Sequence, residues 1–229
     1  MATPQWALER IQAAKEKKST ILNLSGWQAF DCLTEIPDVV FELSQLRTLG
    51  LSNNQFTHLS ESINELQNLR SLDLSNNQLT NLPQTVTGLR NLTSLDLSHN
   101  QLTNLPDAII NLQNLTRLDL NHNQFTSLSE VITRLQNLTS IGLSHNQLTD
   151  LPKAISNLQN LTRLDLSYNQ LVHLPDAITQ LKKLTSLDLR HNLLTSLPDS
   201  IVGLQNLTSL GLSLNQFTHL PDSITNYRI

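Results

Sequence analysis

The chain has 229 residues, enough for one domain or two, and carries a formal net charge of −4 from 15 basic and 19 acidic residues. A nucleic-acid partner would require a clustered basic surface, and a membrane span would require about 18 continuous apolar residues. The sequence has neither feature, so we expect no nucleic-acid partner and no membrane partner.

The N-terminal segment and the cysteine content indicate a compartment. The first residues lack the apolar core that a secretory signal peptide requires. Cys32 is the only cysteine, so no disulfide can form within the chain. Both observations favour a cytoplasmic protein in a reducing environment.

Residues 1–18 are predicted to form a capping helix. Thr3 is a candidate N-cap, and Pro4 suits the first helical position. Apolar residues including Leu8 and Ile11 follow on one side, and the segment ends in lysines, which suit a helix C-terminus. We expect this helix to cover the open edge of the first strand, because unpaired strand edges promote aggregation.

Residues 19–229 are built from repeats. An irregular first repeat spans residues 19–45, and eight 23-residue repeats without insertions begin at residues 46, 69, 92, 115, 138, 161, 184 and 207. They follow the pattern L-x-x-L-x-L-x-x-N-Q-[LF]-T-x-L-P-x-x-I-x-x-L-Q-N. Positions are numbered from the first leucine of a repeat, so Leu92 occupies position 1. Such regular periodicity predicts a stacked array.

Each repeat combines two local patterns. The L-x-L segment at positions 4–6, such as Leu95 and Leu97, alternates buried and exposed residues as a half-buried strand does. Ile109 and Leu112 have the spacing of a short helical turn. No single repeat can bury these side chains alone, so stacking neighbours must form one continuous core.

Position 9 is asparagine in all eight regular repeats. A buried amide without partners costs about 1–3 kcal/mol, whereas its two donors and one acceptor can bond the backbone of adjacent turns. We therefore expect a structural asparagine ladder made of Asn54, Asn77, Asn100, Asn123, Asn146, Asn169, Asn192 and Asn215.

This pattern resembles the leucine-rich repeat. The resemblance implies an α/β solenoid shaped as a right-handed horseshoe, with a parallel sheet on the concave face and short helical or 3-10 turns on the convex face. The 23-residue form is similar to intracellular bacterial proteins and to the Ras-suppressor-like group. The segment LERIQAAKEKKSTILNLSG, followed by LTEIP, resembles the start of the repeat region in Roco GTPases.

Two kinds of chemistry are suggested by single repeats. Asp96, Ser98 and His99 are the residue types of a hydrolase triad, but the corresponding positions of other repeats lose one or more of them while the fold pattern is kept. His99, His122 and His145 could share a divalent ion, but they are more simply explained as copies of one surface position. We predict no catalytic residue, no metal site and no cofactor.

The exposed strand positions suggest a binding surface. Our leading hypothesis is a non-enzymatic scaffold, acting in signal transduction, that binds a protein partner on the concave face. The alternative interpretation of the same charges is a solvated, self-compensating array of aspartates and arginines. The candidate partner-binding residues are Asp96, His99, Arg117, Asp119, His122, His145, Arg163, Asp165, Tyr168, Asp188, Arg190 and His191.

Two other functions stay open at this stage. The chain could be the recognition region of a larger enzyme, such as a Roco GTPase or a bacterial ubiquitin-ligase effector. It could also be a structural module that self-associates through an uncapped C-terminal edge. The last repeat motivates this second alternative, because it ends in Tyr227-Arg228-Ile229 where the pattern expects Leu-Gln-Asn.

Overall fold

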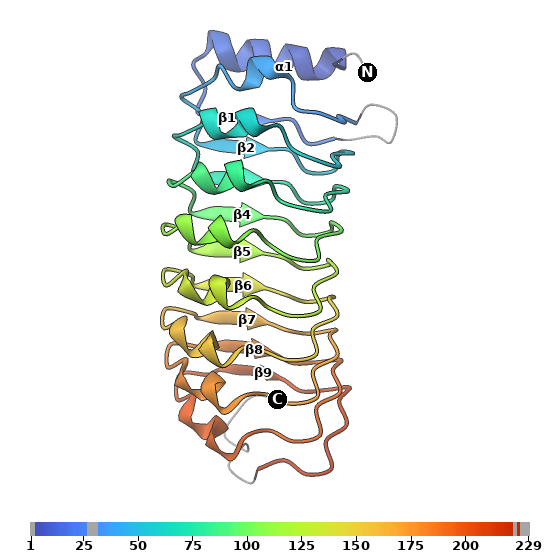
Figure 1. The fold of residues 1–229 in the computed structure, drawn as a ribbon, viewed down its shortest axis with the longest axis vertical. Helices are drawn as coiled ribbons and strands as arrows, with labels where there is room; N and C mark the ends of the chain where they lie inside the picture. The colour runs from blue at the N-terminus through green and yellow to red at the C-terminus, as the bar shows by residue number, and fades with distance from the viewer. Residues whose placement is uncertain (1–2, 27–31, 222–223, 225–229) are drawn as a thin grey trace. The chain divides into compact units, whose positions relative to one another are not determined.

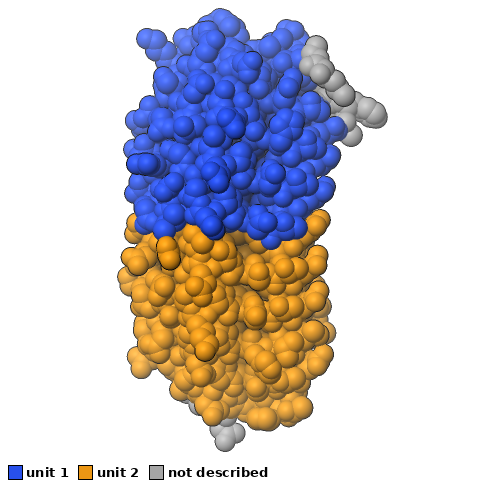
Figure 2. Space-filling view, in the orientation of Figure 1, with its two compact units in different colours: residues 1–115 blue, residues 116–229 orange. Residues whose placement is uncertain are grey.

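A computed structural model describes residues 3–26, 32–221 and 224 of the chain. It forms two compact units, residues 1–115 and residues 116–229, which Figure 2 colours separately. Each unit repeats one motif, in which a three-residue strand is followed by a turn, a short 3-10 helix and a return to the next strand (Figure 1). The predicted C-terminal edge at residues 227–229 lies outside the described residues.

The first unit contains a parallel sheet preceded by one α-helix. Its strands pair in the order β1-β2-β3-β4. The elements are α1 (Gln5–Glu16), β1 (Ile21–Asn23), η1 (Asp38–Val40), β2 (Thr48–Gly50), η2 (Glu61–Glu65), β3 (Ser71–Asp73), η3 (Gln84–Gly88), β4 (Ser94–Asp96) and η4 (Asp107–Asn111).

The second unit contains a parallel sheet with the strand order β5-β6-β7-β8-β9. The elements are β5 (Arg117–Asp119), η5 (Glu130–Arg134), β6 (Ser140–Gly142), η6 (Lys153–Asn157), β7 (Arg163–Asp165), η7 (Asp176–Gln180), β8 (Ser186–Asp188), η8 (Asp199–Gly203) and β9 (Ser209–Gly211).

Equal repeat lengths keep the strands in register. Arg117 pairs with Ser140, and Ser140 pairs with Arg163, so side chains at the same repeat position are neighbours within a unit. The central strand residues, such as Leu118 and Ile141, are fully buried with the other position-4 and position-6 leucines. The other strand side chains, at positions 3 and 5, therefore define the outer face of the sheet.

The α1 helix packs against β1, as Figure 1 shows. It buries Ala7, Ile11 and Ala14, and the Arg10 guanidinium donates to the Asn23 carbonyl at 2.9 Å. The predicted cap was wrong by one residue. Pro4 occupies the N-cap position with an extended ψ of 144°, and no side chain caps the helix. The Pro4 carbonyl instead accepts the first helical hydrogen bonds.

The 3-10 helices η2 to η8 begin after a residue of extended backbone. Proline holds this position in most repeats, with φ near −65° as at Pro106. Ser60 and Ser129 replace it, and their hydroxyls accept hydrogen bonds from the backbone N–H groups of Ser62 and Val131. The two serines therefore act as N-caps.

The position-9 asparagines connect adjacent turns through their amides. The Asn146 Nδ2 donates to the carbonyls of Leu120, Leu143 and Ser144 at 3.0–3.2 Å. Its Oδ1 accepts a hydrogen bond from the Phe125 backbone N–H at 3.0 Å. Because Leu120 and Phe125 belong to the preceding repeat, each amide joins two layers of the stack.

Candidate functional site

Where position 5 is aspartate, its carboxylate stabilises the turn that follows the strand. The Asp96 Oδ1 accepts hydrogen bonds from both the backbone N–H and the hydroxyl of Ser98, at 3.0 and 2.7 Å. Asp165 and Ser167 repeat this pair of contacts at the same distances. These aspartate carboxylates are therefore part of the fold, because each satisfies a turn N–H with a charge-assisted bond.

This geometry does not match a hydrolase triad at Asp96, Ser98 and His99. A triad requires the serine hydroxyl to donate to a histidine, which the aspartate orients. Here the Ser98 hydroxyl donates directly to Asp96. The Ser98 hydroxyl proton is therefore used in a hydrogen bond of the turn.

Position 8 adopts a left-handed backbone in every regular repeat. Its φ lies between 53° and 59°, although none of these residues is glycine. Asparagine and histidine tolerate this region better than bulkier residues do. Tyr168 and Leu214 are the unusual occupants. The residues are Asn53, Asn76, His99, His122, His145, Tyr168, His191 and Leu214.

In the second unit, four position-8 rings stack face to face. The ring centroids of His122 and His145 are 4.0 Å apart, those of His145 and Tyr168 are 4.0 Å apart, and those of Tyr168 and His191 are 3.9 Å apart. The interplanar angles are 11° to 14°. We call these four residues the ring column. Within the column, the faces of the rings that stack are covered by neighbouring rings, so the column offers mainly ring edges to a partner.

The ring column gives no support for metal binding. Within the ranges that the structure describes, no three His, Cys, Asp or Glu side chains are placed to hold a metal ion.

The arginines on β5, on β7 and in the turn after β8 differ in how they are paired. Arg190 contacts both carboxylate oxygens of Asp188 through Nε at 2.9 and 3.0 Å. The hydrogen bond and the charge of Asp188 raise the pKa of the Arg190 guanidinium above its usual value. Arg117 lies 3.6 Å from Asp119. Arg163 is exposed and forms no ion pair among the residues that the structure describes.

The predicted partner-binding residues are divided between the two units. Asp96 and His99 lie in β4 and in the turn after it, within the first unit. The other predicted residues lie on β5 to β8 or in the turns after these strands, within the second unit. There the structure brings the rings into direct contact.

Sequence reasoning predicted Tyr168 but missed three other exposed apolar residues in the turns of the second unit. Val172, Leu193 and Leu214 are 40%, 40% and 64% exposed, and Tyr168 is 43% exposed. A signal was available in the sequence, because each replaces a polar residue or histidine found at that position in most other repeats. Threonine occurs in place of Val172, glutamine in place of Leu193, and asparagine or histidine in place of Tyr168 and Leu214.

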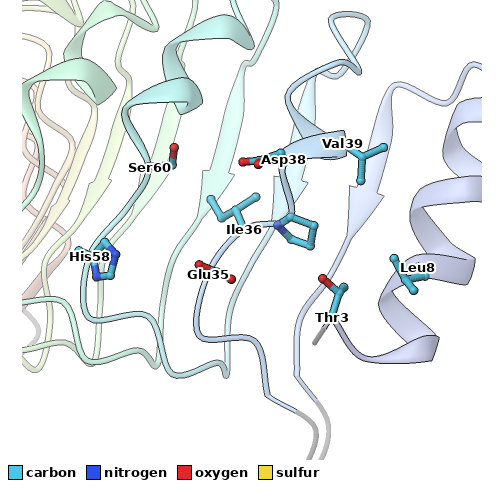
Figure 3. Close-up of a pocket in the computed structure, with 9 residues that line it drawn as sticks. Thr3, Leu8, Glu35, Ile36, Asp38, Val39, His58 and Ser60 are labelled. Atoms are coloured by element: carbon cyan, nitrogen blue, oxygen red, sulfur yellow. The ribbon is translucent and has the colours of Figure 1, made fainter. Parts of the chain in front are cut away.

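The first unit has a separate groove between α1 and the first repeats (Figure 3). It has a volume of about 590 Å³, and its walls include Leu8 from the helix and Ile36 from the irregular repeat. The polar residues Glu35, Asp38 and His58 are exposed. We assign no chemistry to this groove.

Comparison with known proteins gives the family. A model described as a leucine-rich repeat region matches residues 20–140, and a leucine rich repeat model matches residues 113–171, 136–194 and 159–217. The chain belongs to the leucine-rich repeat family. The predicted family and fold class are thus confirmed. No curated protein matches the chain significantly, and the resemblance to Roco GTPases and to the Ras-suppressor-like group stays a prediction.

Solved leucine-rich repeat structures resemble this chain. A leucine-rich repeat protein of Leptospira interrogans is 36% identical, with a TM-score of 0.82. The match covers 93% of this chain and 60% of that one, so the chain spans about three fifths of its relative. The ectodomain of the Arabidopsis thaliana receptor kinase GASSHO1/SCHENGEN3, in complex with CASPARIAN STRIP INTEGRITY FACTOR 2, is 34% identical, with a TM-score of 0.71. That match covers 83% of this chain and 24% of the receptor chain.

A third similar structure is the Toll–Spatzle complex of Drosophila. It is 27% identical, has a TM-score of 0.75, and is matched over 85% of this chain and 26% of that chain. The leucine-rich repeat fold thus indicates a protein–protein interaction module. Among the described residues, no helix is both long and apolar enough to cross a membrane.

Proposed function

We propose that this chain is a non-enzymatic module that binds a protein partner through the outer face of the sheet in residues 116–229. One observation carries the proposal. The aspartates of this face are engaged by their own turns or by neighbouring arginines, whereas Arg163, His145 and Tyr168 are exposed side chains that the core does not require.

The geometry favours an interface over a reaction centre. Arg117 and Arg163 lie on strands of one unit and the ring column lies in the turns after β5 to β8, with in-register spacing. Tyrosine and arginine are enriched at residues that dominate binding energy, because they combine large contact areas with directional polar groups. The two relatives solved in complexes, with CASPARIAN STRIP INTEGRITY FACTOR 2 and with Spatzle, make protein binding a reasonable expectation for this chain.

The test is affinity purification from extracts of the source cell, with the chain as bait. The face variant Arg117→Ser/Arg163→Ser introduces the serine that most other repeats carry at position 3, so the fold should be kept. The control variant Lys182→Gln/Lys183→Asn restores the usual Gln-Asn at positions 22 and 23, away from this face.

We expect one or more proteins to be captured by the wild type and the control and to be lost with the face variant. Equal capture by both variants would contradict the proposed face. Failure of the wild-type bait to retain any protein would count against a binding module.

A further inference from the structure

Four exposed apolar side chains of the second unit lie in the turns after β7, β8 and β9. We define the apolar patch as Tyr168, Val172, Leu193 and Leu214. Within residues 116–221, these are four of the five large apolar side chains that are exposed. The fifth, Val202, lies in η8.

Ring and backbone contacts connect the turns that carry the members of the patch. The Tyr168 ring stacks on His191, and the His191 backbone N–H donates to the carbonyl of Ser213, next to Leu214. The Leu193 backbone N–H donates to the Leu171 carbonyl at 2.9 Å, which places Leu193 beside the Val172 turn. The patch therefore crosses three consecutive repeats.

The fold gives no reason for these four residues. Other repeats carry polar residues at positions 10 and 12 with the same backbone and buried neighbours. Leu214 is the clearest case, because it is 64% exposed and its φ of 59° is disfavoured for leucine. Contiguous exposed apolar residues on a polar protein surface are characteristic of interaction sites.

The charges beside the patch restrict what can bind there. On β5 to β8 and in the turn after β8, three arginines, Arg117, Arg163 and Arg190, balance three aspartates, Asp119, Asp165 and Asp188. The ion pair closest to the patch in sequence joins Asp188 and Arg190, which bind each other through contacts of 2.9 and 3.0 Å. A charged partner segment would lose hydration without gaining a new ion pair from Asp188 or Arg190, because these two already bind each other.

From this surface we infer that the apolar patch docks an uncharged segment of a protein partner that carries aliphatic or aromatic side chains. The inference rests on the proposed protein-binding function, and it names the chemistry of the partner. Binding would cover Leu193 and Leu214 by hydrophobic contact, while the ring edges of the histidines that stack on Tyr168 supply polar contacts at the border of the patch.

The inference is tested by selecting binders from a random peptide library displayed on phage against the immobilised full chain. The selected peptides are then synthesised, and their affinities are measured by fluorescence polarisation. The patch variant Val172→Thr/Leu193→Gln/Leu214→Asn contains only residues that other repeats carry at these positions. Its control is Val202→Ser, which removes a similarly exposed apolar side chain elsewhere and introduces the serine found at this position in the repeat that begins at residue 138.

We expect the selected peptides to be apolar and without net charge. The patch variant should weaken their binding by about tenfold or more, whereas the control should change it less than about twofold. Selection of mainly charged peptides, equal binding to the patch variant, or no enrichment would each overturn the inference.

The two proposals fail in distinguishable ways. In one outcome, Arg117→Ser/Arg163→Ser loses the captured protein and the patch variant retains it. This result would support the outer face as the interface and contradict the apolar patch. The reverse result would assign binding to the patch and contradict the outer face. Thermal unfolding of every variant excludes misfolding as the cause.

Discussion

The Asn121 side chain accepts a hydrogen bond from the backbone N–H of Ser144, in the next repeat, at 2.7 Å. In most repeats this turn N–H is bound by an aspartate two residues earlier, as Asp96 binds Ser98. Gly142 stands where that aspartate would be, and the asparagine of the preceding repeat replaces its function. The glycine leaves the space that the Asn121 amide occupies.

Gly142→Ala should therefore destabilise the second unit by about 2 kcal/mol. A Cβ at residue 142 would lie 2.7 Å from Asn121 Nδ2 and 2.8 Å from its Oδ1, so the amide must move and leave the Ser144 N–H unpaired. Urea unfolding followed by circular dichroism measures the loss. As a control, Gly203→Ala should have little effect, because the nearest atom to its Cβ would be the end of the flexible Lys182 side chain at 3.1 Å, and Thr179 lies at 3.7 Å or more.

The double variant Gly142→Asp/Asn121→Ser offers a rescue of the same turn. It restores the arrangement of Asp96 and Ser98, with an aspartate that binds the turn N–H of its own repeat. We expect stability within about 1 kcal/mol of the wild type. A double variant as unstable as Gly142→Ala would show that the asparagine contact is not the reason for the glycine.

Asn146→Ala should cost about 3 kcal/mol or more, because the asparagine is buried and bonds four backbone groups in two repeats. Thermal unfolding should show a clearly lowered midpoint. The neighbouring Gln147→Ala removes an exposed side chain and should change the midpoint little. Equal midpoints for both variants would mean that the ladder contributes no stability.

Ser129→Ala should reduce stability by about 1 kcal/mol, because the hydroxyl caps η5 at the Val131 N–H. Ser129→Pro should recover most of this loss. The native φ of −60° suits proline, which restricts the unfolded chain and occupies this position in most other repeats. Urea midpoints for the two variants give the comparison, and a proline variant less stable than the alanine variant would refute this explanation.

Leu214→Asn should raise stability by about 1 kcal/mol, because asparagine tolerates the φ of 59° that leucine adopts with strain. Asn53 and Asn76 hold the same position with φ values of 56° and 53°. Leu214→Ala serves as the control and should bring little gain, since alanine lacks the short polar side chain that lets asparagine hydrogen-bond locally in this conformation. A loss of stability with Leu214→Asn would mean that the leucine packs usefully in the fold.

Much of the fold could be predicted from the sequence because one backbone motif recurs at a fixed interval. The L-x-L alternation determines which strand residues are buried, and the invariant asparagine indicates an inward amide that needs backbone partners. The start of α1 was misjudged by one residue. Thr3 and Pro4 satisfy the compositional rule for a helix start, but Pro4 itself adopts the extended conformation that ends the preceding segment.

The roles of the polar surface residues required the tertiary structure. Asp96 and Ser98 look like reactive groups in sequence, yet their hydrogen bonds belong to a turn. The left-handed conformation at position 8 stacks the rings of His145 and Tyr168, which are far apart in the chain. The sequence by itself determined the periodic core, because burial follows from spacing along one chain. Only the tertiary structure decided what the exposed side chains do, because their partners lie in neighbouring repeats.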